Sequence, residues 1–240
     1  MTELKRDIFV TTRWTMVLRA ARSDTTRARA ALEDLCQAYW YPLYAYARRR
    51  GYSPHDAEDL TQGFFARILK LSSLAGVGQE RGKFRAFLLA SMNHFISDEW
   101  DRASAQKRAA EKTISLDAEM AEHRYRNEPV DKLTPERVFE RRWAMTLLEN
   151  VVQRLRDEYQ VSGQGALFTE ARFAITGDKN AVPYAELASR LGLTEEALRV
   201  AVHRLRQRYR RALREEIAQT VADESEVTEE LNCLRRILSA

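Results

Sequence analysis

The feature of the sequence best suited to chemistry is a run of arginines between residues 199 and 214. No acidic residue separates the first from the last of its seven guanidinium groups, which belong to Arg199, Arg204, Arg206, Arg208, Arg210, Arg211 and Arg214. Like charges on one helix repel one another unless a polyanion lies nearby, and guanidinium groups bind phosphate oxygens well. The run therefore predicts a nucleic-acid-binding helix. A solvated helix face in a protein from a GC-rich genome is the alternative, since that coding bias also enriches arginine.

The arginine run lies in a helix-turn-helix pattern. Residues 185–191 fit a short helix, Gly192 supplies a turn, and Thr194 is a typical N-cap for a long second helix. Ala188 is small enough for the point where the two helices cross. This pattern predicts that the start of the second helix enters the major groove of duplex DNA, while later arginines contact phosphates.

A second candidate surface lies on the predicted helix that follows Ser53. Ser53 and Pro54 are typical N-cap and first-turn residues, and the carboxylate of Asp56 favours the positive end of the helix dipole. The apolar face is predicted to contain Ala57, Leu60, Phe64, Ile68 and Leu71, which leaves Asp56, Asp59 and Gln62 exposed on another face. Capping and solvation of a helix start explain these acids as well as an interface does. Metal or catalytic use is a weaker explanation, because His55 is the one histidine nearby.

The composition predicts an all-α protein of two small helical domains joined by a linker. Nine glycines and five prolines among 240 residues leave few turn formers, whereas Ala, Leu, Arg and Glu dominate. The predicted segments are an N-terminal arm (1–27), a first helical domain (28–109), a charged linker (110–134), a second domain that contains the helix-turn-helix (135–221) and an amphipathic C-terminal extension (222–240).

Several classes of protein are excluded or disfavoured. Cys36 and Cys233 lie far apart without CxxC spacing, so neither a zinc site nor a disulfide framework is indicated. The N-terminus lacks an apolar signal segment, and no run of 18 apolar residues occurs. No phosphate loop or nucleophile elbow indicates an enzyme. We therefore expect a cytoplasmic protein with no catalytic residues, no metal and no cofactor.

Two separate segments resemble one protein family. The segment LCQAYWYPLYAYARRRGYSPHDAEDLTQGFFARIL, followed by FRAFLLASMNHFISDEWDR, is similar to conserved region two of the bacterial sigma-70 factors, specifically the extracytoplasmic function (ECF) group. The segment YAELASRLGLTEEALRVAVHRLRQRYR resembles region four. Both segments occur in the family's order with a linker between them, so the resemblance covers most of the chain.

The resemblance implies a bacterial transcription initiation factor. Such a factor binds core RNA polymerase and promoter DNA, recognises and melts the minus-ten element, and reads the minus-thirty-five element with the helix-turn-helix. An anti-sigma regulator is a further partner that the resemblance allows. The alternatives are a stand-alone helix-turn-helix regulator with a helical sensing or dimerisation domain, and a helical adaptor or enzyme that uses the acidic cluster.

The resemblance also implies three groups of contact residues. The expected core-polymerase contacts are Asp56, Asp59, Gln62 and Phe65. The expected minus-ten contacts are Asn93, His94, Ser97, Trp100 and Arg102, where amide and hydroxyl groups can read extruded bases, an indole can stack and an arginine can follow phosphates. The expected minus-thirty-five contacts are Thr194, Glu195, Arg199, Val200, His203, Arg204 and Arg206. The chain departs from many family members at Asn93-His94, where Arg-Asn is common, and at Gly63, where Glu is common. These departures leave the base preference and one polymerase contact open.

Overall fold

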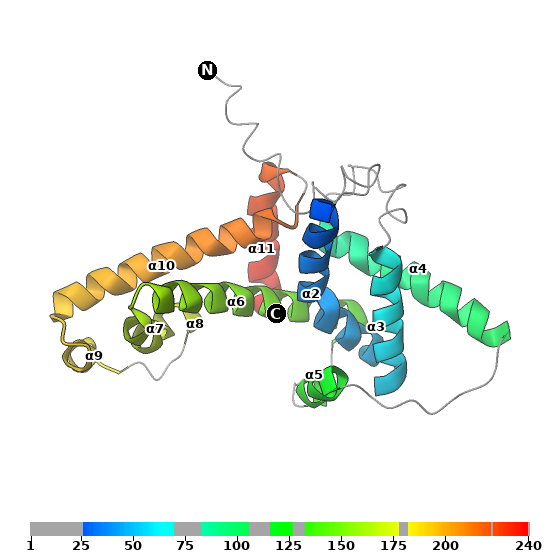
Figure 1. Cartoon of the computed structure of the whole chain (residues 1–240), viewed down its shortest axis with the longest axis horizontal. Coiled ribbons are helices and arrows are strands. Elements are labelled where there is room, and N and C mark those ends of the chain that lie inside the picture. Colours follow the sequence, from blue (N-terminus) through cyan, green and yellow to red (C-terminus); the bar gives the residue numbers. More distant parts are fainter. Residues whose placement is uncertain are drawn as a thin grey trace, which may run out of the picture. The chain divides into compact units, whose positions relative to one another are not determined.

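The computed structural model describes residues 26–69, 83–105, 116–126, 133–177, 182–221 and 223–239, and its regular elements there are helices (Figure 1). The predicted all-α class is confirmed. The helices are α2 (Thr26–Arg49), α3 (Pro54–Ile68), α4 (Phe84–Ala105), α5 (Leu116–Arg126), α6 (Pro135–Val161), α7 (Gly165–Ala171), α8 (Phe173–Thr176), α9 (Tyr184–Arg190), α10 (Glu195–Ala218) and α11 (Glu224–Ser239).

The described residues form two compact units. The first contains the residues up to Thr146 together with those from Ile217 onward, and the second contains Leu147–Glu216. Helix α5 lies in the stretch predicted as a linker, and α11 lies in the predicted C-terminal extension. The first unit therefore includes segments that come before and after the second unit in the sequence. The boundaries of the functional domains named above remain predictions.

The core of the first unit is built largely from aromatic side chains of α2, α3, α4 and α6. Tyr39 of α2 packs edge-on against Phe84 of α4, with ring centroids 5.1 Å apart, and Phe139 of α6 lies 6.4 Å from Tyr39. Phe64 of α3 meets Phe95 of α4 at 5.8 Å. Such contacts add to the stabilisation that burial of the ring area provides. Together they fix α3 and α4 against α2.

Helix α2 continues through Pro42, although proline inside a helix commonly causes a kink or ends the helix. Tyr39, Leu43 and Tyr46, on both sides of the proline, are almost fully buried. Burial of these large side chains stabilises one continuous helix and offsets the backbone hydrogen bond that proline cannot donate.

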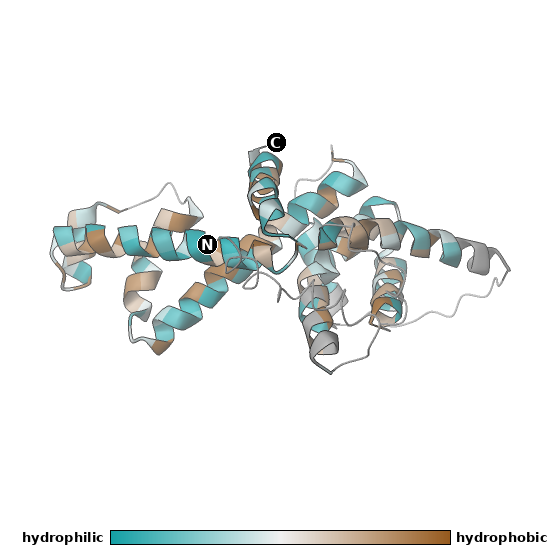
Figure 2. Cartoon of the chain, turned by 90° about the horizontal axis from the view of Figure 1, so that it is seen from above, coloured by the Kyte–Doolittle hydropathy of each residue, from teal (hydrophilic) through white to brown (hydrophobic). Residues whose placement is uncertain are grey.

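The second unit has a separate aliphatic and aromatic core. Val151, Leu155 and Tyr159 of α6 pack with Phe168 of α7 and with apolar residues of α9 and α10, namely Leu187, Ala188, Leu198, Val202, Leu205 and Ala212. Hydrophobic and hydrophilic residues alternate along most helices in Figure 2, as expected when each helix buries one face. No described helix combines the length and the apolar character that crossing a bilayer requires.

Candidate functional site

Helix α3 begins with a reciprocal pair of hydrogen bonds. The backbone N–H of Asp56 donates to Ser53 Oγ at 3.1 Å, and the Ser53 hydroxyl donates to Asp56 Oδ2 at 2.6 Å. Pro54 occupies the first turn. The predicted N-cap is therefore confirmed. The Asp56 carboxylate takes part in this cap and is also exposed on the helix surface.

The four residues expected to contact a polymerase lie on two sides of α3. Asp56 and Asp59 line a cavity of about 1030 Å³ together with Arg50 and Arg67. Asp59 Oδ2 lies 3.6 Å from His55 Nε2 on the same helix. This side of α3 therefore combines two carboxylates with two guanidinium groups. Arg67 belongs to α3, and Arg50 follows α2.

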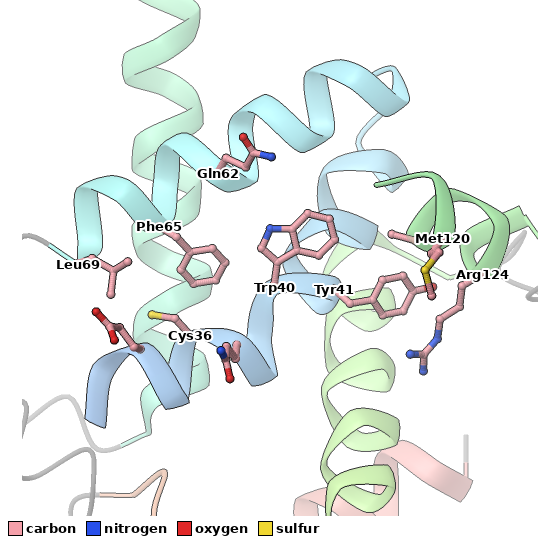
Figure 3. Close-up of a pocket in the computed structure, with 11 residues that line it drawn as sticks. Cys36, Trp40, Tyr41, Gln62, Phe65, Leu69, Met120 and Arg124 are labelled. Carbon is pink, nitrogen blue, oxygen red and sulfur yellow. The ribbon is translucent and has the colours of Figure 1, made fainter. Parts of the chain in front are cut away.

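Gln62 and Phe65 line a different cavity, of about 690 Å³, between α2, α3 and α5 (Figure 3). Gln62 Nε2 donates to Glu58 Oε1 at 2.8 Å, and the side chain of Phe65 is only 7% exposed. Phe65 can reach a partner through this cavity but not from an open helix face. The other lining residues named in Figure 3 are Cys36, Trp40, Tyr41, Leu69, Met120 and Arg124.

The aromatic cluster of α2 lies only partly in the core. Tyr39, Tyr44 and Tyr46 are buried, but Trp40 and Tyr41 are half-buried and line the 690 Å³ cavity. Trp40 stacks on Tyr44 with centroids 5.4 Å apart. One edge of the cluster is therefore accessible from the cavity.

A buried carboxylate that the sequence did not single out, Glu122 of α5, joins this helix to α2. Arg48 donates to it twice, from Nε to Oε2 at 2.8 Å and from Nη2 to Oε1 at 3.0 Å. The Tyr44 hydroxyl donates to Oε2 at 2.9 Å, and Arg126 Nε donates to Oε1 at 2.8 Å. Burial acts to raise the pKa of Glu122, but hydrogen bonds from Arg48, Arg126 and Tyr44 outweigh it and lower that pKa. Glu122 is therefore held as a carboxylate.

The polar face of α4 is partly fixed by α2. Asn93 Oδ1 accepts hydrogen bonds from the Tyr46 hydroxyl at 2.6 Å and from Arg50 Nη1 at 2.9 Å. His94 and Ser97 are exposed, and the Ser97 hydroxyl donates to the backbone oxygen of Asn93 at 3.2 Å. Trp100 and Arg102 belong to α4, but their side chains lie outside the described part of the structure.

Three further observations bear on α3 and α4. Asp98, which shares a helix face with His94, receives a hydrogen bond from Arg67 Nη1 at 2.7 Å. The described residues contain no group of three His, Cys, Asp or Glu side chains arranged to hold a metal ion. At Gly63, a Cβ atom would lie 3.2 Å from Phe95 Cζ, so a larger residue there requires a small shift of the Phe95 ring.

In the second unit, α9 and α10 flank a short connection that glycine makes feasible. Gly192 has a φ of +63°, a conformation that favours glycine. Thr194 Oγ1 accepts a hydrogen bond from the backbone N–H of Ala197 at 3.1 Å, which confirms the predicted cap. Leu187 and Ala188 of α9 are buried in the same core as Leu198 of α10.

All seven residues expected to contact the minus-thirty-five element are exposed. Arg199 Nη2 pairs with Glu195 Oε1 at 2.6 Å, and Arg206 Nε donates to the backbone oxygen of Ala174 at 3.2 Å. Val200 is 46% exposed. The start of α10 thus presents cationic, polar and apolar groups on its surface.

Comparison with known families gives one match, in the first unit. Residues 35–106 match the family model of sigma-70 region 2. The matched segment contains most of α2 and all of α3 and α4. This part of the chain is therefore similar to the region with which sigma-70 factors act in transcription initiation and recognise the minus-ten promoter element. Sigma-70 factors bind core RNA polymerase and promoter DNA and are not enzymes.

The comparisons with curated proteins and with solved structures give no match. Helix α5, with Glu122, lies outside the sigma-70 region 2 match, and so do α9 and α10. Long-range pairs such as Arg48 with Glu122 have no local signature, since 74 residues separate the two partners in the sequence.

Proposed function

We propose that the chain is an ECF-type sigma factor that directs core RNA polymerase to promoters through three surfaces. The observation that carries this proposal is the sigma-70 region 2 match over α2, α3 and α4, the helices that hold two of the three expected groups of contact residues. The protein would act in the bacterial cytoplasm, where polymerase and promoters are found.

Core polymerase would bind around α3. Asp56 and Asp59 are exposed, and their carboxylates would orient the encounter with basic groups of the polymerase. Gln62 and Phe65 would meet the polymerase at the cavity between α2, α3 and α5. Charged residues would then set the association rate, and apolar contacts in the cavity would contribute more to the stability of the complex.

The minus-ten element would bind along α4. Hydrogen bonds from Tyr46 of α2 and from Arg50, which directly follows α2, hold the Asn93 side chain, so little conformational entropy would be lost when a base meets it. His94 and Ser97 are exposed beside it, and Trp100 follows one helical turn after Ser97. Stacking contributes about 1–3 kcal/mol per base, so a few such contacts offset the cost of local melting.

The minus-thirty-five element would be read by the start of α10. Arg199 and His203 can donate to base edges in the major groove, and the exposed Val200 can contact a thymine methyl group. Arg204 and Arg206 would contact phosphates, together with the Thr194 hydroxyl at the helix start, and the Glu195 carboxylate can accept from a cytosine amino group. Phosphate contacts make such binding strongly dependent on salt.

The test is co-elution of the purified protein with sigma-free bacterial core RNA polymerase, followed by transcription from a fragmented genomic library. A sigma factor co-elutes and yields start sites that share two spaced elements. A protein that shifts duplex DNA as a dimer at palindromic sites and does not bind core is a stand-alone regulator, and this result would refute the proposal.

A further inference from the structure

The cavity between α2, α3 and α5 connects the expected polymerase surface with a helix from outside sigma-70 region 2. Phe65 of α3 lines one side of the cavity and Met120 of α5 lines another. The family match ends at residue 106, whereas α5 begins at Leu116. In Figure 3 the ring of Trp40 lies between the labelled side chains of α3 and those of α5.

We infer that α5 forms one wall of the groove that receives core RNA polymerase, with Met120 and Arg124 in direct contact with the polymerase. This inference rests on the proposed function and extends its polymerase surface beyond sigma-70 region 2. The occupant is a surface segment of the polymerase that inserts an apolar side chain and brings an acidic group to Arg124. The reason for choosing this occupant is continuity, because Gln62 and Phe65 belong to the expected polymerase surface and line the same cavity.

The chemistry of the groove suits a protein partner. The side chain of Met120 is 66% exposed although it faces an apolar cavity, and Trp40, Tyr41 and Leu69 are half-buried around it. Methionine adapts its shape to a partner, and accessible apolar surface with a polar rim is typical of protein interfaces. Aromatic, methionine and arginine side chains are the types enriched in such interfaces.

Arg124 is positioned at the rim of the groove. Its guanidinium carbon lies 4.4 Å from the centroid of the Tyr41 ring, a cation–π contact that holds the charge beside the cavity. A carboxylate of the polymerase would pair there with an already oriented guanidinium group, so less side-chain entropy would be lost on binding.

Glu122 is the positioning residue for this wall. It lies between Met120 and Arg124 in the sequence but is buried, and it is bound by Arg48 and Tyr44 of α2. Bidentate pairing with Arg48 restricts both the position and the rotation of α5. The groove therefore has two walls that are fixed to the same helix.

The decisive comparison uses the full-length chain and two methionine variants. Met120→Glu places a charge in the groove and is expected to weaken binding to sigma-free core at least tenfold. Met145→Glu is the matched control, because Met145 is another exposed methionine of the first unit, 37% exposed on α6, and does not line the cavity. We expect its affinity to stay within twofold of the original, and circular dichroism to show both variants folded.

A double-mutant cycle tests the positioning role of Glu122. In a Glu122→Gln background α5 is held less firmly, so Met120→Glu should weaken core binding by a smaller factor than it does alone. Equal factors in the two backgrounds would overturn the role of Glu122, since a merely structural residue gives additive effects.

Two outcomes separate this inference from the proposed function. If Met120→Glu binds core as well as or better than the original chain while Asp59→Lys weakens binding, α5 is not a wall of the groove, yet the sigma-factor proposal stands. If the unaltered chain does not bind core, the proposed function fails first and this inference fails with it.

Discussion

Arg85 and Glu230, 145 residues apart in the sequence, form a buried ion pair that joins α4 to α11 within the first unit. Arg85 Nε donates to Glu230 Oε1, and Nη2 donates to Oε2 at 3.2 Å. The guanidinium group also pairs with Glu140 at 3.1 Å and lies 4.9 Å from the centroid of the Trp143 ring. Burial acts to lower the pKa of Arg85, but the pairing with Glu230 raises it overall, so the charge is retained.

Removal of Glu230 should destabilise the first unit strongly. Glu230→Ala leaves a largely buried guanidinium group without its main partner, which costs about 3–5 kcal/mol of unfolding free energy. Glu229→Ala is the control, because Glu229 is 68% exposed and its partner Lys83 also pairs with Glu230, so the substitution should cost less than about 1 kcal/mol. Urea unfolding followed by circular dichroism measures both. Equal losses in the two variants would contradict the importance of the buried pair.

The contribution of Glu122 to stability should depend on pH. Because the pKa of Glu122 is lowered in the folded protein, its contribution is complete above its ordinary value of 4.5 and is lost as the pH falls through the folded value. Glu122→Gln should therefore be less stable than the original chain at neutral pH, and the difference should shrink in acid. Thermal unfolding from pH 7 down to pH 3 measures it, and a difference that stays constant over this range would refute the assignment.

Charge reversal on α3 should weaken polymerase binding and leave the fold intact. Asp59→Lys is the cleaner variant, because Asp56 also takes part in the helix cap and its replacement would cost about 1 kcal/mol in addition. We expect about a tenfold lower affinity of Asp59→Lys for core at low salt, a smaller loss at high salt, and an unchanged circular dichroism spectrum. Unchanged affinity at low salt would remove Asp59 from the interface.

Loss of Arg199 should affect promoter choice rather than polymerase binding. Arg199→Ala is expected to lose about 1–3 kcal/mol of discrimination at one base pair of the minus-thirty-five element. Arg206→Ala should weaken binding to all sequences and reduce the salt dependence, since Arg206 is assigned to a phosphate. Abortive transcription from a set of promoter variants, with co-elution on core as the control, measures both effects. Loss of core binding in either variant would contradict the division of labour between the two units.

The parts of the structure that the sequence predicts well are those set by neighbouring residues. The Ser53 cap on α3, the glycine at residue 192 and the Thr194 cap on α10 each depend on contacts within four residues. The apolar residues of α10 also recur at helical spacing, and Leu198 and Val202 among them are buried.

Contacts between residues that are far apart in the sequence cannot be predicted from local patterns. Glu122 lay in a stretch predicted as a linker, and neither its charge nor its spacing indicates that Arg48 approaches it from another helix. The burial of Phe65 depends on α2 and α5, which cover one side of α3, and the helix period does not reveal these neighbours. Amphipathic spacing shows which face is apolar, but not which helix covers it.

The burial of Cys36 makes the alkylation rate of its thiol a measure of access to the cavity. Burial, with a smaller effect of Glu33, raises the pKa of the Cys36 thiol to about 12, so its thiolate is scarce at neutral pH, and its sulfur is reached from the same cavity as Phe65 and Met120. Cys233 is more accessible and offers a reference thiol in the same chain. Cys36 should therefore be alkylated more slowly than Cys233, and a ligand that fills the groove should slow the alkylation of Cys36 further.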